Sequence, residues 1–215
     1  SYSVAITDSN GCTGSASTII YEPNDIVYNM NSNSPLCFGD CNGSISVAAI
    51  GGTPSYNYLW DDPSAQTTTT ATGLCSGSYN LIITDANGCP KIATEIITDP
   101  TPISVSAISN DVTCSGNCDG SAIASPSNGS GNYTFNWDDS QTQITQTASN
   151  LCAGVYNVTV NDDNGCNSTT SITVFAPSEL NTSISNSGNN LCNGDQVGFA
   201  QSITVGGIPP YTYLW

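Results

Sequence analysis

The sequence predicts an all-β protein made of tandem β-sandwich repeats, of the Ig-like or fibronectin III-like kind, arranged end to end. Three observations predict this fold. The sequence is similar to itself at a step of 77 residues, which indicates tandem copies of one unit. Helical periodicity is absent, and Thr, Ser, Val, Ile and Tyr dominate, which favours strands. Turn-forming residues recur every ~8–12 residues, the spacing of a sandwich.

The repeat is fixed by cysteines, tryptophans and the segments around them. Cys12, Cys89 and Cys166 are each 77 positions apart. The three tryptophans follow each other at steps of 77 and 78. One repeated segment is SYSVAITDSNGC, SYNLIITDANGC and VYNVTVNDDNGC, at residues 1–12, 78–89 and 155–166. A self-match over so many positions at one period is strong evidence for a repeat protein.

The repeat divides the chain into four stretches. Residues 1–22 are the C-terminal part of a repeat, and residues 23–99 are a complete one. Residues 100–176 are a second complete repeat, and residues 177–215 are the N-terminal part of another. We therefore expect a segment of a longer tandem array.

The residue pattern of the first complete repeat locates six strands, and we expect each unit to be a seven-stranded Ig-like sandwich. Ile45 and Val47 alternate with polar residues and are expected to face inward. The pair Asn87–Gly88 predicts a tight hairpin before the last strand. The predicted strands are 26–33, 44–50, 56–60, 66–72, 78–84 and 92–98.

Four aromatic residues are predicted to build the core. Trp60 lies at the end of a short predicted strand, and Trp137 is its equivalent in the next repeat. Both side chains are expected to be buried between the sheets. Tyr79 follows a glycine at the start of a strand, and Tyr156 is its equivalent, so both resemble a tyrosine corner.

Composition excludes several classes of function. The chain has 17 acidic residues against one basic residue, Lys91, and a formal charge of −16. Nucleic acids and anionic membranes need clustered Lys and Arg, so neither is an expected partner. The chain has no His, which excludes Ser-His-Asp catalysis and His-ligated zinc. No apolar run approaches the ~20 residues of a membrane helix, so no membrane insertion is expected. We expect no enzyme.

The ten cysteines indicate disulfides and an oxidising, extracellular compartment, because no CxxC pair suggests zinc. In a sandwich, the loop with Cys41 and the loop with Cys75 lie at the same end. A disulfide requires Cα atoms within ~7 Å. The sequence therefore predicts the bond Cys41–Cys75 and, one repeat later, Cys118–Cys152.

The partner of Cys37 is left open by the sequence. Cys89 lies at the opposite end of the same unit, about 25 Å away. In a head-to-tail array, Cys37 would instead face Cys166 of the following repeat, which predicts an inter-repeat bond. The alternatives are Cys37–Cys89, which requires another topology, and a local pair such as Cys37–Cys41.

Recurring aspartates allow two interpretations. Asp85 and Asp162 precede the Asn-Gly-Cys turns and are candidate calcium ligands, since calcium binds carboxylate and carbonyl oxygens. The alternative is turn chemistry, because Asp side chains bond their own backbone in turns. No other cofactor is expected.

The segment Tyr56, Tyr58, Trp60 also allows two interpretations. Alternate residues of a strand share one face, so these rings are expected to line the core side. If the tyrosines were exposed in every unit, they would form a multivalent platform for sugars.

The motifs resemble a known family. GGTPSYNYLW at 51–60, then LCSGSY at 74–79, TDANGC at 84–89 and a closing Pro100 together resemble the SprB repeat of very large cell-surface adhesins of Bacteroidota. The second copy departs from the pattern with GSGNY at 129–133, and the last copy lacks one cysteine. The resemblance implies a secreted, surface-anchored filament, exported by the type IX secretion system and used in gliding motility or attachment.

These observations predict an extracellular, cell-surface protein. The leading hypothesis is a structural segment of a long adhesin filament. The alternative is a multivalent polysaccharide-binding module. The expected partners are neighbouring repeats of the same chain, the gliding or secretion machinery, and extracellular polysaccharide.

Overall fold

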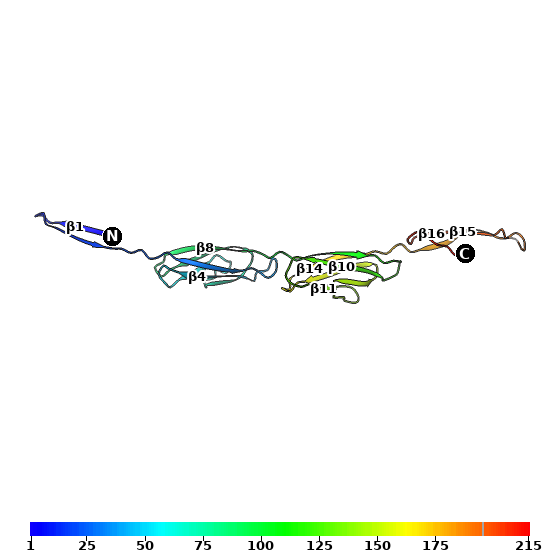
Figure 1. Cartoon of the computed structure of the whole chain (residues 1–215), viewed down its shortest axis with the longest axis horizontal. Helices are drawn as coiled ribbons and strands as arrows, with labels where there is room; N and C mark the ends of the chain where they lie inside the picture. Colours follow the sequence, from blue (N-terminus) through cyan, green and yellow to red (C-terminus); the bar gives the residue numbers. More distant parts are fainter. Residues whose placement is uncertain (195) are drawn as a thin grey trace. The chain divides into compact units, whose positions relative to one another are not determined.

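The computed structural model of the protein describes residues 1–194 and 196–215. The chain divides into two compact units, Ser1–Pro100 and Thr101–Trp215. The regular elements of the described residues are all strands, which confirms the predicted all-β class (Figure 1). None of the described residues belongs to a helix of the length and hydrophobicity that a membrane crossing requires.

The first unit begins with a hairpin and continues with a six-stranded sandwich. The hairpin consists of β1 (Tyr2–Thr7) and β2 (Thr13–Thr18). We call the sandwich the first module. Its strands are β3 (Val27–Asn33), β4 (Gly43–Ile50), β5 (Asn57–Trp60), β6 (Thr70–Leu74), β7 (Gly77–Thr84) and β8 (Pro90–Ile97).

The second unit has the same two parts in the reverse order, with the sandwich first and the hairpin second. Its sandwich, the second module, precedes a hairpin of β15 (Asn181–Gly188) and β16 (Phe199–Val205). The strands of the second module are β9 (Ser104–Asn110), β10 (Gly120–Ser127), β11 (Thr134–Trp137), β12 (Thr147–Leu151), β13 (Gly154–Asn161) and β14 (Asn167–Val174).

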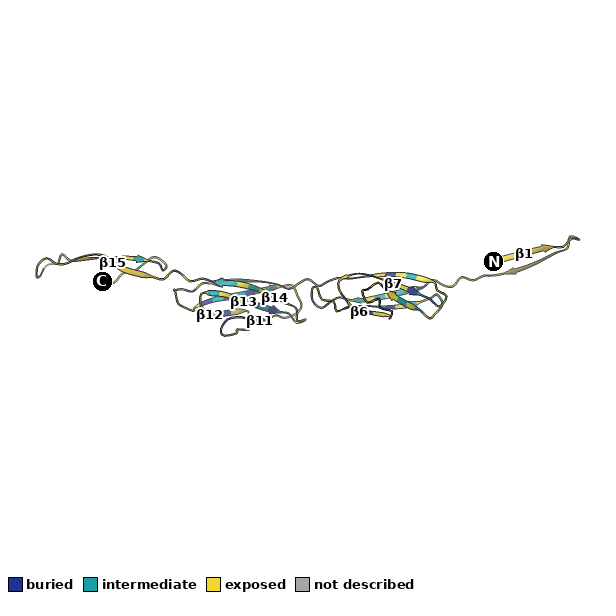
Figure 2. Cartoon of the chain, turned by 180° about the vertical axis from the view of Figure 1, so that it is seen from behind, coloured by how far each residue is buried: buried dark blue, intermediate teal, exposed yellow. Residues whose placement is uncertain are grey.

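Each module packs two antiparallel three-stranded sheets face to face. In the first module the strand orders are β3-β4-β6 and β5-β7-β8, and the second module repeats them as β9-β10-β12 and β11-β13-β14. Inward residues alternate with polar ones, so each strand has one buried face. The core of the first module consists of Ile26, Ile45, Val47, Trp60, Ala71, Leu74, Leu81, Ile83, Ala93 and Ile97. Figure 2 shows buried residues within the modules, whereas β1 is exposed along its length.

The expectation of seven strands is wrong, because each module has six. The residues between β5 and β6 form a loop, which bonds to the strands at single positions, as where the N–H of Val47 donates to the Thr69 carbonyl. The indole Nε1 of Trp60 donates to the Thr68 carbonyl at 2.9 Å, and its backbone N–H donates to the Gln66 carbonyl. The strand predicted at 66–72 spans Thr70–Leu74 instead, and the Gln66 side chain in the preceding loop bonds both backbone groups of Thr72.

The tight hairpin predicted at Asn87–Gly88 is present, since β7 and β8 are adjacent antiparallel strands joined at these residues. The connection between β7 and β8 has five residues, 85–89. The N–H of Gly88 donates to the Asp85 carbonyl at 3.0 Å, and the N–H of Asp85 donates to the Cys89 carbonyl at 3.1 Å. Gly88 has a φ of 82°, a conformation that favours glycine. β8 begins at Pro90, two residues before the start at 92 that the sequence predicts.

Gly43 lies where β4 meets β6 with a register shift. A Cβ atom at Gly43 would lie 2.8 Å from the Leu74 carbonyl and 3.0 Å from the Asn33 carbonyl. Gly120 of the second module is equally enclosed, with Val174 Cγ1 at 2.7 Å. Glycine is therefore required at this position, where three segments of the backbone lie close together next to the core.

We predict that Gly43→Ala lowers the free energy of unfolding of the first module by about 1–3 kcal/mol, because the added methyl group displaces backbone. Urea denaturation followed by tryptophan fluorescence measures this change. Gly14→Ala is the matched control, since a Cβ there meets nothing within 4 Å. Equal stability of the Gly43→Ala variant and the parent chain would contradict the prediction.

Candidate functional site

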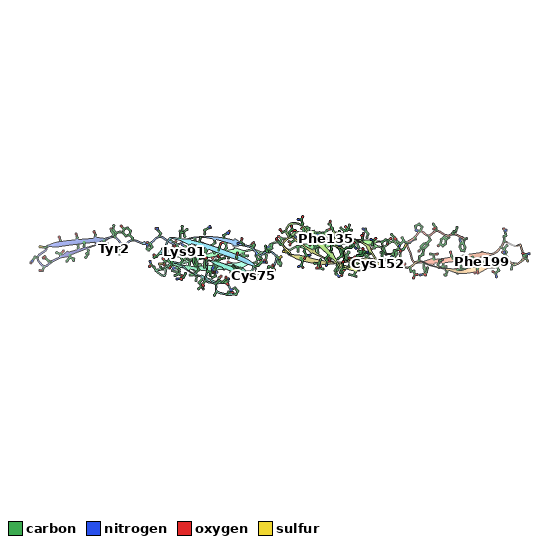
Figure 3. The ribbon with its side chains drawn as sticks, turned by 90° about the horizontal axis from the view of Figure 1, so that it is seen from below. Tyr2, Cys75, Lys91, Phe135, Cys152 and Phe199 are labelled. Atoms are coloured by element: carbon green, nitrogen blue, oxygen red, sulfur yellow. A yellow bond between two sulfur atoms is a disulfide. The ribbon has the colours of Figure 1, made fainter. Side chains whose placement is uncertain are left out.

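Two ends of each module concentrate the side chains that recur between repeats. At one end, a disulfide joins Cys41, in the loop before β4, to Cys75, in the loop before β7. The second module has the equivalent bond between Cys118 and Cys152 (Figure 3). The Cα atoms of the two pairs are 3.9 Å and 3.8 Å apart. The structure thus joins the cysteines that the loop argument paired, and each bond closes 34 residues of chain.

A tyrosine lies beside each of these disulfides. The hydroxyl of Tyr79 donates to the Cys75 carbonyl at 3.0 Å, and Tyr156 donates to the Cys152 carbonyl at the same distance. Both rings are half-buried and pack against the core without entering it. Each tyrosine therefore holds the loop that contains the second cysteine. Trp60 and Trp137, by contrast, are central to the cores, with 1% of each residue exposed.

At the opposite end, an aspartate organises the loop between β7 and β8. The carboxylate Oδ1 of Asp85 accepts the N–H groups of Asn87 and Cys89 at 3.0 and 2.9 Å. Its Oδ2 accepts the N–H of Thr53 from the loop after β4, at 2.9 Å. Asp85 is buried, with 3% exposed. One side chain thus shapes its own loop and joins it to the opposite sheet.

The second module repeats this arrangement at Asp162. Its Oδ1 accepts the N–H groups of Asn164 and Cys166 at 3.0 and 2.9 Å, and its Oδ2 accepts the N–H of Ser130 at 2.9 Å. Both carboxylates therefore accept hydrogen bonds from the backbone of their own turns, as the turn interpretation predicts. The calcium site at Asp85 and Asp162 stays a prediction. Among residues 1–194 and 196–215, no three His, Cys, Asp or Glu side chains are grouped as metal ligands.

A second aspartate closes the long loop after each buried tryptophan. Asp62 accepts the N–H groups of Ser64 and Gln66 and the side-chain amide of Gln66, at 2.9–3.0 Å. Asp139 makes the same contacts with Gln141 and Gln143. Sequence reasoning missed the glutamine, although the Asp-x-x-x-Gln spacing in both repeats was a visible signal.

Hydrogen bonds control the acidity of these carboxyl groups. The backbone N–H groups of Thr53 and Cys89 hold the pKa of Asp85 below its ordinary value of 3.8. Burial raises the pKa of Asp62, but bonds from Gln66 and Ser64 outweigh it, so the net pKa is lowered. The pKa of Asp139 is lowered by the same balance. The charged forms are thus stabilised by donors from the fold itself.

The structure also narrows the pairing of Cys37. Cys41 is bonded to Cys75, so the local pair Cys37–Cys41 is wrong. Cys89 is an exposed free thiol, so the pair Cys37–Cys89 is wrong as well. The inter-repeat bond between Cys37 and Cys166 stays a prediction.

The tyrosines considered as a sugar platform are not fully open. Tyr56 and Tyr58 are half-buried and pack against the core of the first module, on the face of Trp60. The hydroxyl of Tyr56 donates to the Gly51 carbonyl at 2.5 Å, and Tyr133 donates to the Asn128 carbonyl in the second module. These rings support the turn after the second strand of each module.

Comparisons with known proteins confirm the family that the motifs resemble. Residues 29–65 and 106–142 each match the model of the SprB repeat. Two stretches of the chain, one within each module, are therefore of the SprB-repeat type. No curated protein matches the chain.

Solved structures similar to the chain contain Ig-like or fibronectin III-like modules. A Dscam structure matches with 13% identity and a TM-score of 0.29, over 78% of this chain and 51% of that chain. The fibronectin(III)-like modules of Clostridium thermocellum CbhA match with 16% identity and a TM-score of 0.28, over 69% and 94%. The chain thus spans about half of the Dscam structure. The sandwich is established by the two sheets of each module and the core that they share.

We predict that replacing Cys41 and Cys75 together by Ser lowers the free energy of unfolding of the first module by about 2–4 kcal/mol. The bond closes a 34-residue loop and restricts the unfolded chain. Urea denaturation under non-oxidising, non-reducing conditions measures the loss. The control replaces Cys12 and Cys89, which are free thiols, by Ser. A loss as large in the control would show that the effect is not due to the bond.

We predict that acid destabilises the first module through Asp85. A carboxyl whose pKa is lowered by folding stabilises the fold fully above its unfolded pKa, near 3.8, and loses this contribution as pH falls through the lower folded pKa. Urea midpoints measured between about pH 5 and pH 2 should therefore fall more steeply in the parent chain than in Asp85→Asn. Asp85→Asn should also be less stable at neutral pH. Equal slopes in the two chains would contradict this role of Asp85.

Proposed function

We propose that this chain is a structural segment of a long, secreted adhesin filament on a cell surface. SprB repeats and the Ig-like fold support the broader statement that it is a repeat module of a cell-surface protein. The observation that supports the structural role is that both modules keep the same disulfide and the same two aspartate-centred loops. The recurring polar side chains are used to hold strands and loops together.

A tensile role explains why the loops are closed twice, by covalent and by hydrogen bonds. The disulfide joins the loops before β4 and β7, which belong to different sheets. Asp85 joins the loops after β4 and β7 at the opposite end. Separation of the two sheets therefore requires both ends to open. The charge of −16 opposes lateral clumping of neighbouring filaments.

We further propose that the filament serves gliding motility or attachment, with export through the type IX secretion system and partners in the gliding or secretion machinery. The support is the SprB repeat alone. No catalytic activity forms part of the proposal. Binding of extracellular polysaccharide stays a prediction, which the half-buried positions of Tyr56 and Tyr58 do not favour.

The inter-repeat bond between Cys37 and Cys166 belongs to the same proposal. The two cysteines are separated by 129 positions and lie in loops of successive repeats. A bond between them would carry tension past most of both modules. It would also repeat along an array, because Cys114 is the equivalent of Cys37 and Cys89 is the equivalent of Cys166.

We predict distinct extensions when the chain is pulled from its ends in a single-molecule force experiment. With the Cys37–Cys166 bond, the oxidised chain should not release residues 38–165. Cys37→Ser should restore two cooperative unfolding events, one for each module. Reduction should then lengthen each event by about 12 nm, since 34 residues of about 3.5 Å are freed from each loop.

The two parts of the proposal fail in different ways. Two short events in the oxidised parent chain would contradict the inter-repeat bond and leave the tensile role intact. A smooth extension without cooperative events in Cys37→Ser would contradict the tensile role, because modules that yield gradually cannot sustain load. The control is Cys12→Ser, which removes a free thiol and should pull like the parent.

A further inference from the structure

The strand β6 is the last strand at one edge of its sheet in the first module, as β12 is in the second. The N–H of Val47 in β4 donates to the carbonyl of Thr69, just before β6, at 2.9 Å. Backbone groups of successive residues point to opposite sides of a strand, so those of Thr70 and Thr72 point away from β4. An edge of this kind is a template for pairing with a strand of another molecule.

Side chains of the preceding loop occupy this edge. The Oε1 of Gln66 accepts the N–H of Thr72 at 3.1 Å, and its Nε2 donates to the Thr72 carbonyl at 2.9 Å. The hydroxyl of Thr68 donates to the Thr70 carbonyl at 2.6 Å. The amide of Gln66 thus makes the two bonds that one residue of a neighbouring antiparallel strand would make. We call the side chains of Gln66 and Thr68 the edge cap.

The second module has an equivalent edge cap. The Oε1 of Gln143 accepts the N–H of Ser149 at 3.0 Å, and its Nε2 donates to the Ser149 carbonyl at 2.9 Å. The hydroxyl of Thr145 donates to the Thr147 carbonyl at 2.6 Å. The capped residue is Thr72 in one module and serine in the other, whereas the capping side chains are the same. The edge cap therefore recognises the backbone of the edge strand.

A buried aspartate fixes the amide of the edge cap. The Nε2 of Gln66 also donates to Asp62 Oδ2 at 3.0 Å, so both amide hydrogens are used. Asp62 is 5% exposed and accepts the backbone N–H of Gln66 through Oδ1 at 2.9 Å. The amide therefore cannot leave the edge without breaking its bond to a buried carboxylate.

Stability alone does not explain the edge cap. Thr70 and Thr72 are exposed, so water can bond the same backbone groups. Soluble proteins commonly protect an exposed edge with charged side chains or proline. Neither β6, with the sequence TATGL, nor β12, with TASNL, contains a charged residue or a proline. The edge cap supplies a protection that the composition of these strands lacks.

We propose that the edge cap prevents β6 of one chain from pairing with β6 of a second copy, and β12 from pairing in the same way. Two uncapped edges related by a twofold axis would pair antiparallel and join two sheets into one. The charge of the chain does not oppose this contact directly, because the strands that would meet are uncharged. Tandem modules need such protection, since similar neighbouring domains are prone to misassembly.

The experiment removes the edge cap of the first module with Gln66→Ala and Thr68→Ala in the full chain. The backbone bonds of Gln66 to Asp62 and Trp60 stay available, so the loop keeps its course. Free thiols are alkylated without reduction. In sedimentation equilibrium, the average mass should rise with concentration toward twice that of the parent chain, because one open edge permits a dimer. Removal of the second cap as well, with Gln143→Ala and Thr145→Ala, should give larger assemblies.

Matched variants separate the open edge from other causes of association. Thr67→Ala with Thr69→Ala changes the same loop but none of the capping side chains, and should keep the mass of the parent. Asp85→Asn weakens the opposite end of the module and should also keep that mass. Thr72→Pro, added to the uncapped first module, removes the exposed N–H and should abolish the dimer. Urea denaturation shows whether the modules of each variant are folded.

Hydrogen exchange of the Thr72 N–H, followed by NMR, locates the contact independently. Exchange should be several-fold faster in the dilute uncapped variant than in the parent, because the bond to Gln66 is lost. It should slow again at concentrations where the dimer forms. This measurement decides the proposal even if the Thr72→Pro variant does not fold.

Three results would overturn the proposal. An uncapped variant that keeps the mass of the parent at every concentration would show that the glutamine and threonine only shape the loop. Association of Asp85→Asn or of the Thr67 and Thr69 variant to the same degree would assign the effect to lost stability. A dimer in which the Thr72 N–H still exchanges rapidly would place the contact on another surface.

Discussion

The small core is the constraint on which each module depends. Two sheets of three strands enclose only ten buried apolar residues in the first module, and a domain of this size buries a modest share of its surface. Hydrophobic burial alone gives such a fold little stability in reserve. The loops must therefore add what the core lacks. A disulfide at one end and a buried carboxylate at the other meet this need, and Trp60 is the largest fully buried side chain of the core.

The two modules differ in the core and agree in the loops. Ile45 of the first module corresponds to Ala122 of the second, and Leu81 corresponds to Val158. Hydrophobic packing tolerates such changes when neighbouring side chains adjust. The aspartates tolerate no comparable change, because each oxygen meets N–H groups at fixed positions. A buried donor left without its acceptor costs more than a small gap does. This difference explains why the motifs of the repeat are turn motifs.

The sequence predicted what period and composition determine. The 77-residue step located both modules, and the alternation in 44–50 identified the buried face of β4. The position of the loops at one end of a sandwich predicted the pairing of Cys41 with Cys75, which are bonded in the structure. The sequence could not show that the glutamine at position 66 would replace ladder bonds, since this depends on the position of Thr72 in the fold. The five-residue loop at Asp85 was hidden for a similar reason, because its shape is set partly by the N–H of Thr53, 32 residues earlier.

The unequal residues at positions 45 and 122 have a consequence for biogenesis. Adjacent domains of similar sequence are prone to exchanging strands as they fold. If β10 entered the first module in place of β4, Ala122 would replace Ile45 and leave a void costing about 2–5 kcal/mol. The reverse exchange would force an isoleucine into a space that fits a methyl group. The difference between the buried residues of the two copies thus disfavours strand exchange, so that each strand of the repetitive polypeptide folds into its own domain.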